Sequence, residues 1–293
     1  MRREQTPLAR IAGEFAESRL ALAGLALFAL ILLAAVFAPL IAPQNPYDLA
    51  QLDVLDSRLP PGAKSGNGLT FWLGSDDQGR DILSGIFYGL RISLVVGAAS
   101  TLCALAIGLA LGIAAAYFGG RSDATIMRVA DIQLSFPSIL IALILLALLG
   151  QGIGKTIFAL IMVQWAYYAR AVRGAALIER GKDYIEAARG LALPRARILL
   201  RHLLPNCLPP LIVIATVQIA AAIALEATLS YLGIGVPITE PSLGLLIKNG
   251  YDYMLSGKYW ISFFPGVALL LTIVSINLVA DRLRDVLNPR LQQ

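Results

Sequence analysis

Three parts of the sequence contain residues whose types and spacing could support chemistry. The run LGQGIGKT, residues 149–156, ends in the Gly-Lys-Thr of a phosphate-binding loop. Three aspartates between residues 76 and 81 are close enough in sequence to suggest a cation site. His202 is the only histidine, and Glu186 begins the run EAARGLALPRARILLRHLLPN inside a strongly basic segment. These residues are the candidates for catalysis, metal binding or recognition.

The sequence context favours a structural interpretation for most of these candidates. A phosphate-binding loop needs glycine where Leu149 stands, and no strand is expected before it, so we interpret the run as a glycine turn between helices. The aspartate spacing matches no EF-hand loop, and helix capping could use two of the three, so we expect no metal site. A single histidine gives no support for a His-based catalytic triad. We therefore expect no enzyme and no cofactor in this chain.

The elements that must position these residues are membrane-spanning helices. Hydrophobic residues make up 57% of the 293 residues and charged residues only 15%, well below the roughly 25% of soluble domains. Six apolar runs reach or approach the roughly 20 residues that cross a bilayer as a helix. They are residues 20–38, 92–118, 132–149, 153–169, 208–236 and 260–280. The fourth run contains Gln164, and we expect Trp165, Tyr167 and Tyr168 to form its interfacial end. The expected fold is an all-α integral membrane protein with six transmembrane helices.

The placement of lysine and arginine predicts the orientation. With a cytoplasmic N-terminus, the inner segments hold 17 of the 24 cations and the outer segments hold 7. Both termini should therefore be cytoplasmic, and the net charge of +5 needs no nucleic-acid partner. The expected organisation is a cytoplasmic tail (1–19), a first span (20–42), an extracytoplasmic loop (43–91), a core of five spans (92–280) with a long loop at 175–206, and a cytoplasmic tail (281–293).

Two hydrophilic insertions interrupt the spans. In the outer one, Ser75 could cap an amphipathic interfacial helix that leads into the second span. In the inner one, Asp183 could cap a helix that runs to Leu191, and a second helix could run from residue 195 to 204 before Pro205 stops it. The inner hairpin could be a solvated connector, but connections between helices usually take only roughly 2–8 residues. Its length therefore favours a docking element.

The inner hairpin resembles the EAA loop found in permease subunits of binding-protein-dependent ABC importers. Glu186, Ala187, Ala188, Leu204 and Pro205 match that pattern, whereas the expected glycine is Ala192 here, with Gly190 two residues earlier. The resemblance implies a cytoplasmic loop that couples the spans to ATPase subunits. The implied coupling residues are Tyr184, Glu186, Ala187, Ala188, Gly190, Leu191 and Ala192.

Further segments extend the resemblance over nearly the whole chain. LGSDDQGRDILSGIFYGLRISL, YFGGRSDATIMRVADIQLSFPSILIAL, EATLSYLGIGV and FFPGVALLLTIVSINLVADRLRDVLNPRL are similar to blocks of the C-type permease of dipeptide, oligopeptide and nickel importers. The resemblance implies a type I importer fold in the bacterial inner membrane and half of a path for peptides, with a nickel chelate or a glutathione-like ligand as alternatives. The implied partners are a second, homologous permease, two cytoplasmic ATPase subunits that bind ATP and Mg²⁺, an extracytoplasmic binding protein and membrane lipid.

An ion-coupled secondary transporter is the alternative from another class. It predicts internal repeats and several intramembrane carboxylates, but only Asp131 and Glu226 are candidates and no convincing repeat is found. Glu226 lies on one small and polar face of the fifth span, roughly 27 Å from its cytoplasmic start. We hypothesise that this face borders the translocation path; the alternative is that Glu226 bonds to neighbouring helices. The candidate path residues are Gln218, Ala222, Glu226 and Ser230.

Overall fold

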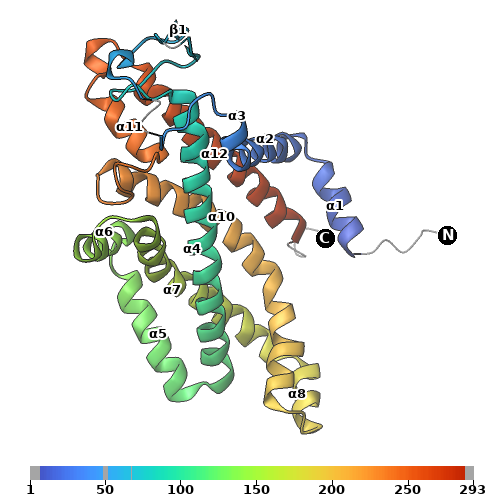
Figure 1. Ribbon diagram of the computed structural model, residues 1–293. Coiled ribbons are helices and arrows are strands. Elements are labelled where there is room, and N and C mark those ends of the chain that lie inside the picture. Colours follow the sequence, from blue (N-terminus) through green and yellow to red (C-terminus); the bar gives the residue numbers. More distant parts are fainter. Residues whose placement is uncertain (1–6, 49–51, 67, 288–293) are drawn as a thin grey trace, which may run out of the picture.

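The computed structural model describes residues 7–48, 52–66 and 68–287, and these residues form a largely helical molecule (Figure 1). The outer ends of both predicted tails lie outside the described residues. The helices are α1 (Pro7–Ala16), α2 (Arg19–Val36), α3 (Ala38–Ile41), α4 (Ile82–Phe118), α5 (Gly120–Leu134), α6 (Ser138–Leu149), α7 (Ile153–Arg180), α8 (Asp183–Gly190), α9 (Arg195–Arg197), α10 (Leu204–Tyr231), α11 (Leu243–Tyr251) and α12 (Trp260–Leu287). Shorter elements are the 3₁₀ turns η2 (Val54–Asp56) and η4 (Met254–Ser256), the π-helical turn η3 (Ile198–Leu203), and the two-residue antiparallel strands β1 (Ala63–Lys64) and β2 (Thr70–Phe71).

Four helical segments within the described residues are long and apolar enough to cross a membrane: α2, α4, the continuous segment Arg195–Tyr231 that ends in α10, and α12. The pair α5 and α6 qualifies as a fifth only if it is one broken span, since its two helices are bent by 89°. The predicted span at residues 132–149 is therefore not one continuous helix, because it includes the end of α5, the break and α6. Pro137 explains the break, because a proline disfavours helical geometry at the residue before it, here Phe136. The fold is a multi-pass helical membrane protein with four or five candidate spans.

The most extensive helix packing joins α4 to α7. A Cβ atom on Gly108 would lie 2.4 Å from Cβ of Tyr168, and one on Gly112 would lie 2.6 Å from the carbonyl oxygen of Ala169. The two glycines therefore let the α4 backbone approach α7 within this chain. Trp165 and Tyr168, which were expected at the interfacial end of the fourth span, are both buried inside the chain, Trp165 partly against α5.

A cap made of residues 43–48, 52–66, 68–81 and 232–259 covers the end of α4 at which Ile82 lies (Figure 1). The Asp81 carboxylate, not the Ser75 hydroxyl, caps α4 by accepting a hydrogen bond from the Ser84 amide at 2.8 Å. Ser75 instead accepts one from the Leu59 amide at 2.8 Å. The predicted separate amphipathic helix is the first part of α4, which continues through residue 118 without interruption.

Hydrogen bonds of the aspartates stabilise the loop of the cap that precedes α4. The buried Asp76 carboxylate accepts hydrogen bonds from the Arg80 amide at 2.9 Å and from the Arg80 guanidinium at 2.7 Å. Burial raises the pKa of Asp77, and the negative charge of Asp76 adds to this shift. Within the part of the chain that the structure describes, no group of three metal-ligating side chains occurs.

The close approach of α4 and α7 predicts different effects of adding a methyl group on each helix. Gly108→Ala should lower the free energy of unfolding by roughly 1–3 kcal/mol, because the new Cβ would overlap Tyr168 and the Trp165 carbonyl. Gly174→Ala on α7 is the matched control, because nothing lies within 4 Å of its added Cβ and alanine favours a helix by about 1 kcal/mol. Thermal unfolding of the detergent-purified chain measures both. Equal midpoints for the two variants would contradict the packing described here.

Candidate coupling and translocation sites

The charged hairpin between α7 and α10 consists of α8, a turn, α9 and η3. Lys182, not Asp183, is the N-cap of α8, and no side chain bonds the first amides. Asp183 lies in the first turn, where its charge favours the positive end of the helix dipole. The predicted cap at Asp183 is thus displaced by one residue.

The turn after α8 contains the position at which the EAA pattern expects glycine. Ala192 has φ of 51°, in the left-handed region, and its amide donates to the Arg189 carbonyl at 2.9 Å. Left-handed backbone costs a non-glycine residue roughly 1–2 kcal/mol. Gly190 is still within α8 and is not among the residues with positive φ, so it does not replace the missing glycine. Ala192 therefore makes a glycine-type turn at some cost in backbone strain.

The hairpin has a small apolar core of its own. Ile185, Ala188 and Ile198 are buried against one another, and Tyr117 at the end of α4 packs beside them. Ala188, one of the implied coupling residues, is therefore buried within the hairpin and does not present its side chain to a partner. Its methyl group faces inward because it lies three residues after Ile185, on the same face of α8.

The outward face of the hairpin carries most of the other predicted coupling residues. Glu186, Ala187, Gly190 and Ala192 are exposed, and the Leu191 side chain is 76% exposed. An exposed leucine beside small residues and one carboxylate is a surface that a partner protein could cover.

A hydrogen-bond network joins this hairpin to both neighbouring long helices. The Tyr184 hydroxyl donates to the Glu179 carboxylate at the end of α7, and the Asn206 amide in α10 donates to the Tyr184 oxygen at 3.0 Å. Lys182 pairs with Glu179 at 2.7 Å. Burial, together with the hydrogen bond to Glu179 and its negative charge, raises the pKa of Tyr184 to about 12, which keeps the hydroxyl protonated.

Sequence reasoning did not identify Glu179 or Asn206 as functional residues. The only local signal was the spacing of Glu179 and Lys182, which lie three residues apart and can pair on a helix. The contact from Tyr184 to Asn206 spans 22 residues, so it depends on the folded hairpin.

Pro205 does not end the second helix of the hairpin, contrary to the expectation. In an α-helix its ring would clash with the carbonyl four residues earlier, but the preceding turn η3 is π-helical, and the Leu204 amide bonds to the Leu199 carbonyl five residues back. The Asn206 side chain also donates to the His202 carbonyl at 2.8 Å. The widened turn accommodates the proline, and α10 continues through Pro209 and Pro210.

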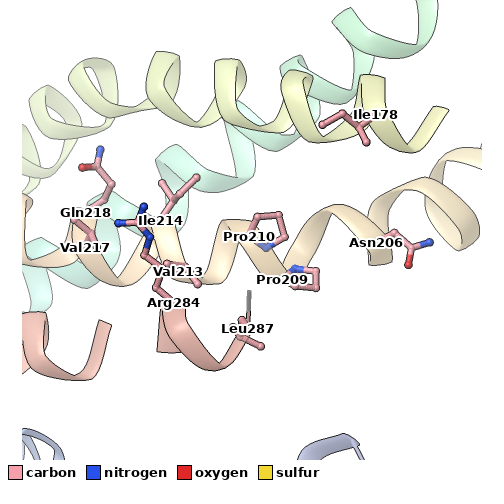
Figure 2. A pocket seen from close by; sticks show the side chains of 10 residues that line it. All are labelled: Ile178, Asn206, Pro209, Pro210, Val213, Ile214, Val217, Gln218, Arg284 and Leu287. Atoms are coloured by element: carbon pink, nitrogen blue, oxygen red, sulfur yellow. The ribbon is translucent and has the colours of Figure 1, made fainter. Parts of the chain in front are cut away.

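A groove of about 800 Å³ lies between the ends of α7 and α12 and the first half of α10 (Figure 2). Its lining is mainly apolar, with Asn206, Gln218 and Arg284 as the polar side chains. The lining residues are Ile178, Asn206, Pro209, Pro210, Val213, Ile214, Val217, Gln218, Arg284 and Leu287. Gln218 is thus the one predicted path residue that reaches this groove. We call it the α10 groove.

The other predicted path residues are enclosed by this chain. Glu226 is fully buried, and its carboxylate accepts hydrogen bonds from Ser93 of α4 and Ser230 of α10, both at 2.8 Å. Ala222 and Ser230 are buried as well.

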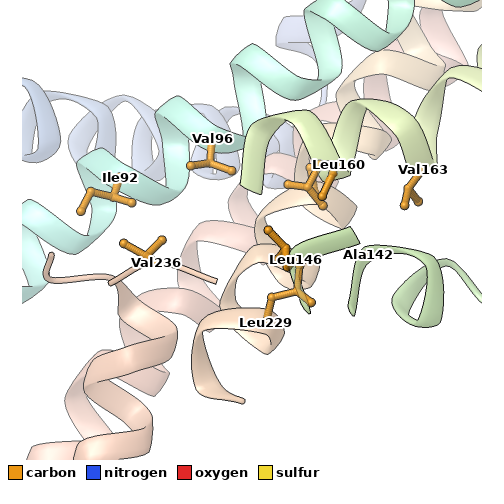
Figure 3. Close-up of a cluster of buried hydrophobic side chains, with 10 residues drawn as sticks. Ile92, Val96, Ala142, Leu146, Leu160, Val163, Leu229 and Val236 are labelled. Carbon is orange, nitrogen blue, oxygen red and sulfur yellow. The ribbon is translucent and has the colours of Figure 1, made fainter. Parts of the chain in front are cut away.

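Apolar side chains from four helices pack beside this polar group. Ile92 and Val96 of α4, near Ser93 in sequence, belong to one buried cluster with Leu229 of α10 and with side chains of α6 and α7, and Figure 3 shows Ile92 beside Val236 and Leu229 beside Leu146. The open side of α10 carries Val217 and Thr228 instead, and Glu226 lies about half a turn away from Val217. The structure therefore places Glu226 among neighbouring helices of its own chain, which is the alternative weighed against a path-facing carboxylate.

The other candidate residues from the sequence make contacts that stabilise the fold. The Gly152 amide donates to the Gly235 carbonyl at 3.0 Å, and α7 begins directly afterwards, so LGQGIGKT forms a turn between α6 and α7. Asp131 on α5 pairs with Arg170 on α7. The ring of His202 lies 6.4 Å from that of Tyr184.

Comparison with known proteins shows that two parts of the chain match family models. Residues 108–293 match the family model "Binding-protein-dependent transport system inner membrane component", and residues 6–61 match "N-terminal TM domain of oligopeptide transport permease C". A similar protein is the di/tripeptide transport system permease protein DppC of Pseudomonas aeruginosa, 37% identical, covering 98% of this chain and 93% of that protein. The oligopeptide transport system permease protein OppC of Bacillus subtilis is 36% identical, with 95% and 88% covered.

Solved structures of two transporters resemble the fold. One is the MetNI methionine ABC transporter in inward-facing conformations, with a TM-score of 0.56 and 22% identity over 69% of this chain and 96% of that chain. Another is an amino acid ABC transporter with histidines, with a TM-score of 0.52 and 14% identity over 67% and 91%. At these identities the likeness concerns the fold alone.

The buried Glu226 site predicts a difference between two substitutions. Glu226→Leu should lower the free energy of unfolding by roughly 1–3 kcal/mol, because the serine hydroxyls of α4 and α10 lose their buried acceptor. Glu226→Gln should have a smaller effect, because its amide can still accept one of these bonds and donate another. Thr228→Leu, two residues away on the open side, is the control. Thermal unfolding and co-purification of partner subunits are the measurements, and a wild-type midpoint for Glu226→Leu would be the contrary result.

Proposed function

The chain belongs to the family of binding-protein-dependent transport system inner membrane components, and we propose that it forms half of the translocation path of an ATP-driven importer of di- or oligopeptides. The names of full-length relatives support peptide over a nickel chelate or a glutathione-like ligand. As a permease subunit it is not an ATPase, and ATP hydrolysis belongs to separate subunits. The hairpin with its exposed, weakly polar face is the structural observation that carries the proposal, because an ion-coupled transporter has no use for it.

The proposed topology has six spans with both termini in the cytoplasm. α7 supplies the additional span, because its 28 residues extend about 42 Å and its middle is buried against α4. The bent pair α5 and α6 is then one broken span. The distribution of 17 cations inside and 7 outside supports this orientation. The hairpin at 175–206 and the tails at 1–19 and 281–293 then lie in the cytoplasm, and the cap lies outside.

The proposed partners follow from these surfaces. Two ATPase subunits bind at the cytoplasmic hairpin, a second, homologous permease completes the path, and an extracytoplasmic binding protein delivers substrate to the cap. Tyr184, Glu186, Ala187, Gly190, Leu191 and Ala192 form the coupling site, with Ala188 as its internal support. Gln218 faces the path at the α10 groove, while Ala222, Glu226 and Ser230 hold α10 in place behind it.

The proposed mechanism is alternating access driven from the hairpin. ATP binding draws the two ATPases together and moves the hairpins that they hold. The network from Glu179 through Tyr184 to Asn206 then passes this displacement to α7 and α10 at the same time. The decisive experiment is reconstitution of the permease pair with its ATPases and binding protein in liposomes. ATP-dependent uptake of a labelled dipeptide is expected, and uptake driven by an ion gradient without ATP would contradict the proposal.

The coupling site predicts loss of ATPase contact from changes on its outward face. Glu186→Arg or Ala187→Trp should reduce pull-down of the ATPase subunits and uptake at least tenfold, because each changes the surface that the partner covers without touching the buried Ile185 core. Ala196→Trp is the control, an exposed alanine on the other arm of the hairpin. Wild-type pull-down and uptake in both test variants would reduce the hairpin to a connector.

The orientation predicts which introduced cysteines an impermeant thiol reagent can reach. In a background with Cys103 and Cys207 replaced by serine, Ser256→Cys in the cap should react in intact spheroplasts. Ala196→Cys in the hairpin should react only after permeabilisation. Both positions are exposed in the structure, so burial does not explain a difference between them. Labelling of Ala196→Cys from outside would overturn the proposed topology.

A further inference from the structure

The α10 groove contains a cation whose partner is not evident from the fold. Arg284 lies in the last turn of α12 and lines the groove. No ion pair or hydrogen bond joins it to another of the residues that the structure describes. Its neighbour Arg282, in contrast, bonds to the Glu14 carbonyl and pairs with Glu17 at 3.7 Å. Arg284 is therefore available to an anion that enters the groove.

The direction of the side chain distinguishes Arg284 from an interfacial anchor. Figure 2 shows it rising from α12 toward α10, in the part of the groove where Ile214 and Val217 lie. Side chains on a helix incline toward its N-terminus, so Arg284 leans away from the end of α12 and from Leu287. An arginine that reached for lipid headgroups would extend toward the helix end instead. This direction favours a ligand inside the groove over a lipid phosphate.

The chemistry of the groove suits one end of a peptide. Guanidinium binds carboxylate through two parallel hydrogen bonds, and these are stronger among apolar walls than in water. Val213, Ile214 and Val217 supply such walls, and the Gln218 amide can bond to a peptide group beside them. The α10 groove therefore combines one anion-binding group, the Arg284 guanidinium, with apolar walls that apolar side chains of a peptide can contact.

We propose that the α10 groove binds the C-terminal carboxylate of a peptide at Arg284, with Gln218 positioned beside it. This inference rests on the proposed import of peptides and specifies which end of the substrate this subunit recognises. In the proposed orientation the groove lies in the cytoplasmic half of α10, so it receives the peptide after the binding protein has released it. Arg284 exchanges an exposed, hydrated state for a carboxylate partner, so binding remains weak enough for release.

The test measures binding of labelled dialanine to the purified importer without its binding protein, with dialanine amide as the competitor. Wild type should bind dialanine at least tenfold more tightly than its amide. Arg284→Gln should weaken dialanine binding about tenfold and abolish the preference for the free carboxylate. Arg284→Lys should lose only a few-fold, because it keeps the charge but not the bidentate geometry. Arg128→Gln, an exposed arginine on α5 outside the groove, should behave as wild type.

Several outcomes would overturn the inference. Equal loss of dialanine and amide binding in Arg284→Gln would mean that the residue shapes the groove without reading the carboxylate. Failure of this variant to co-purify with the other subunits would assign Arg284 to a permease contact, and restoration of binding by added anionic lipid would assign it to a headgroup. ATP-dependent dipeptide uptake by wild type separates the two proposals. Uptake without carboxylate-dependent binding would refute only the proposed binding at Arg284, whereas absence of uptake would refute the proposed import of peptides.

Discussion

The close approach of α4 to α7 is the constraint on which the arrangement of the other helices depends. Gly108 and Gly112 allow two backbones to meet where lipid offers no hydrophobic drive for association, so dispersion contacts along the seam hold the pair together. Two ion pairs then fix α5 beside α7, one of them between Arg173 and Asp123 at 2.6 Å. The Arg180 guanidinium donates to the Ala116 carbonyl at 2.7 Å and closes the far end of α4 onto α7. The hairpin begins directly after this closure, so the seam determines where the hairpin lies.

One hydrogen bond, from Asn206 in the α10 groove to Tyr184 in the proposed coupling site, joins the hairpin directly to the groove. Asn206 lines the groove and donates a hydrogen bond to Tyr184, whose hydroxyl in turn bonds to the buried Glu179. A displacement of α8 therefore moves a wall of the groove without passing through an intervening loop. The prolines that follow leave α10 with fewer internal hydrogen bonds in this region, which makes bending easier here than in its second half.

Composition and spacing predicted much of the fold, because lipid imposes long apolar helices that can be read from any single segment. The hairpin was also predictable, since Glu186 and its neighbours stand out in an apolar chain. The predictions that failed depend on backbone geometry or on contacts that the residue pattern of a single segment does not show. Pro205 continues a helix because a π turn precedes it, and Ala188 faces inward because Ile198 returns to cover it. Glu226 has the character expected of a path residue, and only Ser93, 133 residues away, shows that it is enclosed.

The length of α4 has a mechanical consequence for the cap. Its 37 residues extend about 55 Å, whereas a bilayer with its headgroups is about 40–45 Å thick, so a helix perpendicular to the membrane would project about 10 Å beyond the lipid. A Cβ added at Gly85 or Gly89 in its first turns would contact Leu246 or Leu243 of α11, so the cap packs closely on α4 at this end. The cap thus stands on a rigid stem. A tilt of about 10° around the middle of α4 would carry the cap sideways by roughly 5 Å. In the proposed orientation, the sideways displacement of the cap would report at the outer surface how far the helices beneath it have tilted.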